Sequence, residues 1–262
     1  MLTEPLAEAE TLPEGLVLVP GGIEDDAIAG ALPDAEIARI LGEGRIVILK
    51  GVFPAEEMLS YRRAVLRWAA EEPEYPRDRS PNSTPDVNYW RTDRGDYPQG
   101  IPHVFRQYGL NTPERQPPFV GAPTQRIAGL LLDLQNRIGG TDWDISLTGM
   151  RVKLLHYPVG GGYLTEHEHP IEPQRVGLIA SMSRAGEDFA SGGTAFRTPF
   201  GRVHTAMHHD IGDVILFRYD TPHAVTPVEP DRALDWESEA GKWSFVLDLR
   251  ETSGLSKAVR GA

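Results

Sequence analysis

Two histidines separated by one residue, His167 and His169, follow a glycine-rich segment at residues 160–162. On an extended strand, side chains two residues apart lie on the same face, so both imidazoles are expected to point the same way. Neutral imidazole is a common protein ligand for iron, copper, nickel and zinc. The pair therefore predicts two ligands of a metal site.

The best candidate for a third ligand is His223, which lies in a second strand-turn-strand pattern at residues 212–228. Three ligands on one face of a metal leave positions open for a substrate or co-substrate. The chain has no cysteine, so the ligands must be His, Asp or Glu. Glu166 and Glu168 are alternatives: an unbroken strand places them on the face opposite His167, and a bulge could bring one back. A site without a functional metal is the third interpretation.

Composition indicates what kind of protein carries this site. The 262 residues are 40% apolar with a net charge of -12, which favours one compact domain and disfavours a nucleic-acid backbone as partner. No apolar run is long enough to span a membrane, and the N-terminus lacks the pattern of a signal peptide. We expect a cytoplasmic protein that acts on a small molecule.

Helices are predicted in the first half of the chain, after a loose N-terminal segment at residues 1–33 that contains one candidate strand at 16–19. Apolar residues at helical spacing indicate a short helix from Asp34 to Gly42 and a longer one between Pro54 and Pro73. Thr124 is the predicted N-cap of a third helix, which the glycines at 139 and 140 end. We expect this helix to pack against a sheet.

Short strands separated by turn signals dominate the second half. The predicted strands are 146–157, 163–169, 176–183, 194–196, 214–217, 223–228 and 243–249. Helices followed by many short strands predict an α+β, mainly β fold: an antiparallel sandwich or jelly roll with flanking N-terminal helices. We therefore expect a single domain over residues 1–262 with a jelly-roll core at 146–250.

Residues 72–123 form a long stretch rich in Pro, Asp, Asn and Arg, and such stretches often serve as lids or binding loops. Our working hypothesis is a lid or insert that covers the substrate; a surface excursion without function is the alternative. Cations here and on the strands (Arg151, Lys153, Arg175 and Arg197) could gather around an anionic substrate. The candidate substrate residues are Tyr89, Trp90, Arg91, Arg94, His103 and Arg106.

Lys242 and Ser244 share one face of the last predicted strand, while Trp243, Phe245 and Leu247 take the other. A cation and a hydroxyl can therefore meet one carboxylate above an apolar layer. A hydrogen bond of this charged kind contributes on the order of 1.5 to 3 kcal/mol. The segment predicts a carboxylate-binding site.

We expect four other histidines to have structural roles. His204, His208 and His209 precede a Gly-Asp turn at 212–213 and are expected to be solvated or to cap a strand. His156 alternates with apolar residues on a strand face, which is typical of a core histidine.

Four segments in this order resemble the non-heme iron(II), 2-oxoglutarate-dependent oxygenases of the double-stranded β-helix fold, in particular the phytanoyl and prolyl hydroxylase branches. They are the Tyr, Gly-rich bend and His-x-His at 157–169, the Gly-Gly-Thr-Ala-Phe hairpin at 192–196, Gly-Asp with the distal histidine at 212–223, and Lys-Trp-Ser at 242–244. The resemblance implies an oxygenase that uses Fe(II), 2-oxoglutarate and O2 to hydroxylate or otherwise oxidise a small molecule. It places the metal at His167, His169 and His223, and the co-substrate at Lys242, Ser244 and Tyr157.

His169 departs from that resemblance, because the related proteins have Asp or Glu at this place. A third imidazole brings no negative charge to the metal. Two other functions therefore stay open: a three-histidine dioxygenase that is independent of 2-oxoglutarate, and a catalytically silent jelly-roll binding protein.

Overall fold

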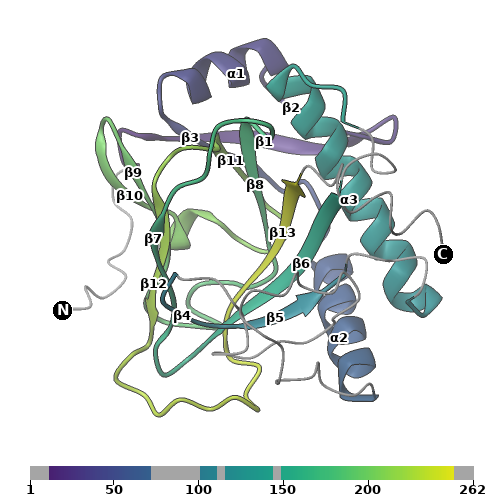
Figure 1. Ribbon diagram of the computed structural model, residues 1–262, viewed down its shortest axis with the longest axis vertical. Coiled ribbons are helices and arrows are strands. Elements are labelled where there is room, and N and C mark those ends of the chain that lie inside the picture. The colour runs from purple at the N-terminus through teal and green to yellow at the C-terminus, as the bar shows by residue number, and fades with distance from the viewer. Residues whose placement is uncertain (1–11, 72–100, 111–115, 144–148, 251–262) are drawn as a thin grey trace.

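The computed structural model describes residues 12–71, 101–110, 116–143 and 149–250. Two β-sheets lie face to face, and helices cover the outer side of the larger one (Figure 1). The prediction of a mainly β fold with helices outside the sheets is confirmed. No helix within the described ranges is long and apolar enough to cross a membrane.

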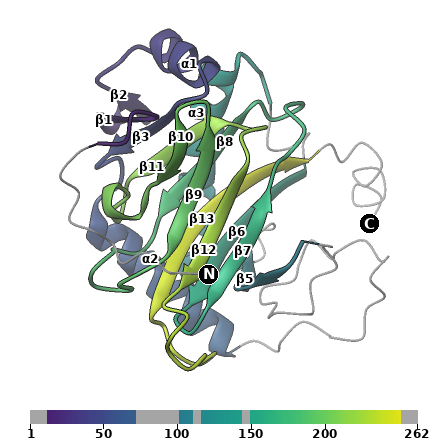
Figure 2. The same ribbon diagram turned by 90° about the vertical axis from the view of Figure 1, so that its left-hand side faces the viewer.

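Within the described ranges the large sheet has eight strands and the small sheet has five. In spatial order the large sheet contains β2 (Ala27–Gly30), β1 (Leu16–Glu24), β3 (Ile46–Lys50), β11 (Val214–Arg218), β8 (Val176–Ser181), β13 (Gly241–Arg250), β6 (Gly149–Pro158) and β5 (Arg106–Gly109). The small sheet contains β10 (Gly201–His204), β9 (Gly193–Thr198), β12 (His223–Val228), β7 (Gly162–His167) and β4 (His103–Val104). Figure 2 shows β13 running along β6 and β12 running along β7, as their antiparallel pairing requires.

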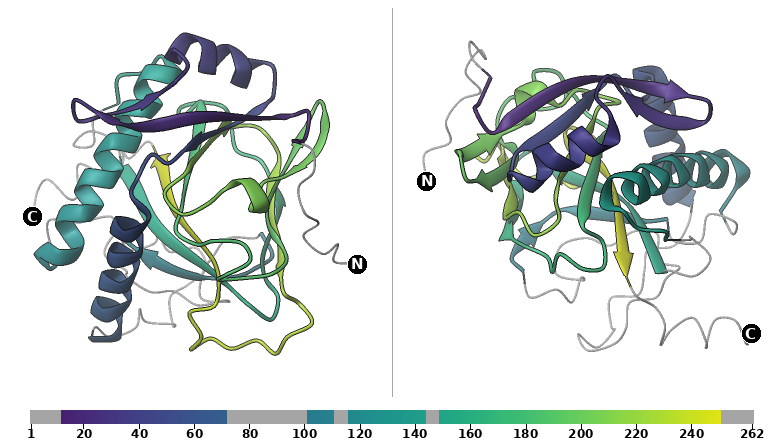
Figure 3. Two further views of the ribbon diagram at one scale, coloured as in Figure 1. Left: turned by 180° about the vertical axis from the view of Figure 1, so that it is seen from behind. Right: turned by 90° about the horizontal axis from the view of Figure 1, so that it is seen from above.

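The described residues form three α-helices on the outer side of the large sheet: α1 (Asp34–Gly42), α2 (Ala55–Glu71) and α3 (Pro118–Gly139). Figure 3 shows α2 and α3 lying along one side of the molecule and α1 near β3. Their apolar stripes share one core cluster with residues of the sheet, among them Val65, Leu131 and Trp243. Helix packing therefore fixes the outer face of the large sheet.

Strict alternation along β6 and β13 separates this outer core from the interior between the sheets. Val152 and Leu154 pack in the helix-facing core, as do Trp243 and Phe245. The residues between them, such as Leu155, face the small sheet. Because strand side chains alternate, each strand presents one face to the helices and the other to a central cavity.

Three elements differ from the expectations. Residues 16–30, within the segment expected to be loose, form β1 and β2 and extend the large sheet. Helix α3 begins at Pro118, six residues before the predicted cap, because a proline suits the first helical turn. Thr124 instead lies inside α3, where its hydroxyl donates to the carbonyl of Val120 at 2.8 Å and lies 2.6 Å from the hydroxyl of Tyr61.

The predicted lid at 72–123 is partly structured. Residues 103–109 form β4 and β5, and residues 118–123 belong to α3. The stretches 72–100 and 111–115 lie outside the described residues. The strand boundaries in the second half differ from those predicted by a few residues, and β10 was not predicted.

Candidate metal centre

Three histidines converge on the space between the sheets: His167, His169 and His223 each offer a ligand atom, and these atoms lie within 4.8 Å of one another. His167 ends β7 and His223 begins β12, and the two residues are register partners across this antiparallel pair. Their ring centroids are 4.3 Å apart. Strand pairing thus brings together two histidines that are 56 residues apart in the sequence.

Backbone carbonyls fix the protonation of these two rings. Nδ1 of His167 donates to the carbonyl oxygen of Thr165 at 3.0 Å, and Nδ1 of His223 donates to that of Thr221 at 2.9 Å. Since a carbonyl oxygen only accepts, the proton of each neutral ring is on Nδ1 and the lone pair is on Nε2. Metal-binding histidines commonly show this arrangement, in which the second nitrogen is held by a carbonyl or carboxylate.

His169 lies two residues beyond the end of β7, although the predicted strand included it. Its ring stacks on Tyr219 with centroids 4.5 Å apart and an interplanar angle of 11°. The ring centroid lies 5.0 Å from that of His167 and 5.4 Å from that of His223. Aromatic stacking therefore places this imidazole beside the other two where strand pairing no longer does.

Burial keeps the histidines in the form that binds metals. Burial, and after it the neighbouring His167, lower the pKa of His223 to about 3. Burial also lowers the pKa of His167. At neutral pH both rings are neutral, so a metal ion does not have to displace a proton from them.

The two glutamates considered as alternative ligands lie elsewhere. Glu166 forms an ion pair with Arg197, whose side chain is exposed, and Glu168 is itself exposed. Neither joins the histidine cluster found among the described residues. The pairing of β7 with β12 shifts register between Leu164 and His167, yet Glu166 still pairs with Arg197 and not with the histidines. The imidazole of His169 is therefore the third donor of the cluster.

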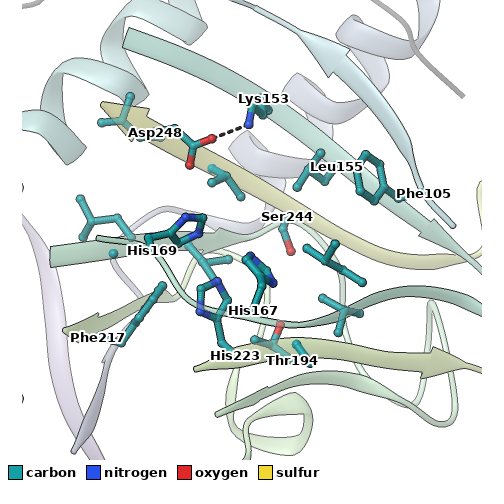
Figure 4. A pocket seen from close by; sticks show the side chains of 18 of the residues that line it. Phe105, Lys153, Leu155, His167, His169, Thr194, Phe217, His223, Ser244 and Asp248 are labelled. Carbon is teal, nitrogen blue, oxygen red and sulfur yellow. Dashed lines mark hydrogen bonds and ion pairs between the residues drawn. The ribbon is translucent and has the colours of Figure 1, made fainter. Parts of the chain in front are cut away.

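The histidines border a cavity of about 370 Å³ between the sheets. Its walls are mainly apolar and include Val225. Figure 4 shows Phe105 and Leu155 on one side and Phe217 on another. The ring of Phe217 lies 4.9 Å from that of His223. This ring covers Gly177, where a Cβ atom would approach it to 2.2 Å. The glycine allows the aromatic ring to pack against the metal-binding side of the cavity.

An ion pair interrupts the apolar wall. Lys153 on β6 and Asp248 on β13 line the cavity and pair with each other, and their side chains are only 8% and 13% exposed. Figure 4 shows this pair on the same side of the cavity as His169. Asp248 was not singled out from the sequence. The alternation that selected Lys242 and Ser244 continues to Val246 and Asp248, so the signal was present.

Lys242 is 3% exposed, and its ammonium group makes no hydrogen bond or ion pair within the described parts of the chain. It shares a strand face with Ser244 and is the register partner of Tyr157, and these two residues line the cavity. Burial lowers the pKa of Lys242 to about 8. A buried cation without a partner fits an anionic group of a ligand, because that group would offset its desolvation.

The candidate substrate residues that the structure describes do not line the cavity. Tyr89, Trp90, Arg91 and Arg94 lie outside the described residues. His103 stacks on Phe105 with centroids 4.4 Å apart, and Arg106 donates to the backbone carbonyl of Trp236. Neither residue lines the cavity. On β5 the residue after Arg106, Gln107, lines it instead.

The strand cations are also engaged elsewhere. Arg175 pairs with Glu172 and donates to the carbonyl at the end of α3, while Arg197 pairs with Glu166. Lys153 alone of these lines the cavity in the described structure, and Asp248 balances its charge. The side chain of Arg151 is outside the described residues.

The remaining histidines have structural positions. His156 is fully buried and stacks on Trp243 with centroids 4.0 Å apart, as expected for a core histidine. His209 differs from the expectation, since it is buried and its Nε2 donates to the carbonyl of Asp213 at 3.2 Å. Its place behind the Gly-Asp turn accounts for this burial.

Several solved structures are similar to this chain. A prolyl-4-hydroxylase from Pseudomonas putida aligns with a TM-score of 0.54 and 14% identity, over 84% of this chain and 99% of its own. A prolyl hydroxylase from Trichoplax adhaerens, in complex with a hypoxia inducible factor peptide fragment, aligns at 0.53 and 13% identity over 86% and 93%. The non-heme alpha ketoglutarate dependent epimerase SnoN, from nogalamycin biosynthesis, aligns at 0.53 and 11% identity over 82% and 79%. No family model and no curated protein sequence matches the chain.

These alignments show that the chain shares the fold of the prolyl hydroxylases and of SnoN. One structure of SnoN holds Fe3+, alpha ketoglutarate and a nogalamycin derivative. The resemblance read from the sequence motifs is therefore matched by structural neighbours of the same class. At 11–14% identity this agreement concerns the fold.

Proposed function

We propose that this chain is an Fe(II)- and 2-oxoglutarate-dependent oxygenase that hydroxylates or otherwise oxidises a small molecule, with the metal held by three histidines. The observation that carries the proposal is the convergence of His167, His169 and His223 on one cavity. The strand face that lines this cavity also carries the ammonium of Lys242, which has no partner among the described residues. A facial metal site and a separate cation are what a chelating 2-oxo acid with a distal carboxylate requires.

The order of the strands supports a double-stranded β-helix. From β6 to β13 the chain alternates between the large and the small sheet, and only the hairpin of β9 and β10 stays within one sheet. The four strands β11-β8-β13-β6 then face β10-β9-β12-β7. We infer from this order a jelly roll, a fold in which facing strands enclose a central site.

The residues of the site have distinct tasks in this proposal. Bound Fe(II) with 2-oxoglutarate and O2 would supply the oxidation of a C–H bond. The protein orients and shields the reacting groups. The carbonyls of Thr165 and Thr221 hold the imidazoles of His167 and His223 with Nε2 available. Lys242 and Ser244 would bind the distal carboxylate, with Tyr157 beside them.

The residues that line the cavity indicate the polarity and charge of the substrate. The mainly apolar lining favours a small molecule with an apolar body. The described cations give no support for a preference for anions, because Lys153 is paired with Asp248 and Arg175 and Arg197 are engaged elsewhere. We therefore propose a small-molecule substrate without a required negative charge.

A three-histidine dioxygenase that does not use 2-oxoglutarate is the second candidate, and His169 favours it. Such an enzyme would bind its substrate directly to the metal through the open positions. It would give the buried ammonium of Lys242 no ligand, and for this reason it ranks second.

Anaerobic calorimetry separates the two candidates. We expect 2-oxoglutarate to bind the Fe(II)-loaded protein and to bind the metal-free protein far more weakly. Aerobic incubation should then convert 2-oxoglutarate to succinate. Equal affinity with and without Fe(II), together with oxygen uptake that is indifferent to 2-oxoglutarate, would exclude the first candidate and favour the second.

A further inference from the structure

The ion pair of Lys153 and Asp248 has no evident structural purpose. Both side chains are largely buried in a cavity wall that is otherwise mainly apolar. Burying two charges costs several kcal/mol per ion in typical proteins, and apolar residues of similar volume are often at least as stable. A pair in this position therefore calls for a role in the cavity itself.

Its position relates it to the histidines. Lys153, Asp248 and all three histidines line the same cavity, and Figure 4 shows the carboxylate of Asp248 on the side of His169. Asp248 is the only acidic residue among the described residues that line this cavity. Glu166 is occupied by Arg197 at the surface, and Glu168 is exposed.

The charge of the site explains what a carboxylate would do there. Three imidazoles are neutral, so a divalent metal would bring two uncompensated positive charges into a largely apolar cavity. Charges interact strongly in such surroundings.

We propose that Asp248 supplies, from outside the ligand set, the negative charge that His169 does not bring to the metal, and that Lys153 holds the carboxylate and moderates its charge. This inference rests on the proposed metal site. Asp248 is a positioning residue in this account: it acts on the metal through the field it creates across the cavity. Outer-sphere partners of this kind typically change metal affinity by about 10- to 100-fold.

Two substitutions of opposite charge test the idea. Equilibrium binding of Mn(II) to the full chain, without 2-oxoglutarate, is measured for wild type, Asp248→Asn and Lys153→Met. We expect Asp248→Asn to weaken binding by about tenfold and Lys153→Met to strengthen it. A purely structural ion pair would not give opposite signs, because breaking it from either side would disturb the same packing.

A control and a double-mutant cycle complete the test. Glu166→Gln removes a carboxylate from a surface ion pair next to His167 in the sequence, and its Mn(II) affinity should equal that of wild type. In His169→Asp the carboxylate enters the ligand set, so a further Asp248→Asn should cost much less than it does in wild type. Unfolding of each variant by denaturant confirms that a folded protein is compared.

The possible failures are distinct. If wild type binds Mn(II) but Asp248→Asn and Lys153→Met leave the affinity unchanged, or shift it in the same direction, the role of Asp248 is refuted and the metal site stands. If wild type does not bind Mn(II), the proposed function itself fails.

Discussion

His167 and His223 are register partners on the antiparallel strands β7 and β12, with ring centroids 4.3 Å apart. Backbone pairing of the small sheet brings these two rings together. Each ring is also anchored through Nδ1 to a carbonyl two residues earlier. The fold itself therefore positions both rings, and positions fixed in this way lower the cost of binding a ligand.

The packing behind the site can be tested at Gly177. A Cβ atom here would lie 2.2 Å from the ring of Phe217, which packs near His223. Gly177→Ala should therefore destabilise the fold by about 1 to 3 kcal/mol and weaken metal binding, because Phe217 must move. Denaturant unfolding measures the first effect and Mn(II) titration the second.

Gly129→Ala is the matched control. This glycine lies inside helix α3, and no atom is within 4 Å of an added Cβ. The substitution should stabilise the protein by about 0.5 to 1 kcal/mol without changing metal affinity. Equal stability of the Gly177→Ala and Gly129→Ala variants would contradict the packing described for Phe217.

Lys242 should determine the affinity for the distal carboxylate of 2-oxoglutarate. Lys242→Met should weaken 2-oxoglutarate binding to the Mn(II)-loaded protein by about 10- to 100-fold, the worth of one charged hydrogen bond of about 1.5 to 3 kcal/mol. Pyruvate has the same 2-oxo acid group but no distal carboxylate, so its affinity should not change. A parallel loss for both ligands would mean that Lys242 supports the metal site and does not recognise the carboxylate.

The same residue predicts a pH dependence. Burial lowers the pKa of Lys242 to about 8, so its ammonium form predominates below that pH and is lost above it. Affinity for 2-oxoglutarate should be constant below about pH 8 and fall by about tenfold per unit above it. The affinity for pyruvate, measured anaerobically with Mn(II) over the same range, should lack this decline. In Lys242→Met the decline for 2-oxoglutarate should disappear, so that both ligands show the same pH dependence.

Much of this site could be predicted from the sequence because it depends on local patterns. The alternation around Lys242 specifies one face of a strand, and Lys242 and Ser244 share that face in β13. The spacing of His167 and His169 predicts neighbouring imidazoles, and the two ring centroids lie 5.0 Å apart although His169 is beyond the end of β7. Strand alternation alone does not predict that His223 joins the other two histidines. Its partnership with His167 depends on the pairing of β7 with β12, which only the motif order suggested.

Other features depend on contacts that a local pattern does not contain. His169 lies beyond its strand and is placed by the ring of Tyr219, 50 residues later. The pair of Lys153 and Asp248 joins two neighbouring strands from distant parts of the chain. The start of α3 was wrongly predicted because Thr124 resembles a cap, whereas the proline at 118 begins the helix.

Acid should destabilise the fold through His156. Burial lowers the pKa of this histidine to about 3, whereas in the unfolded chain it titrates near 6.5. Between these values the unfolded state binds more protons, so the contribution to stability is complete above about pH 6.5 and is lost as the pH falls toward 3. His156→Phe should keep the stacking on Trp243 but reduce the loss of stability between pH 7.5 and 5.

Denaturant unfolding of wild type and His156→Phe at both pH values measures this difference. His204→Phe provides the comparison, because that histidine is exposed at the end of β10. A loss of stability that is equal in wild type and His156→Phe would show that other groups govern the acid sensitivity.

Substitutions of His169 separate a working site from an inactive one. His169→Ala should reduce Mn(II) affinity strongly, because two imidazoles define the metal geometry poorly. His169→Asp should retain binding, since a carboxylate is an alternative ligand on the same face. A catalytically silent barrel would show no change in metal content with either variant.

The most direct test of the three-histidine centre is a crystal structure of the protein with Mn(II) and 2-oxoglutarate. We predict one metal ion with a ring nitrogen of each of His167, His169 and His223 at about 2.0 to 2.2 Å, near the known distance for imidazole and zinc. An occupied metal site with the ring of His169 turned away, or with Glu166 or Glu168 in its place, would contradict the account.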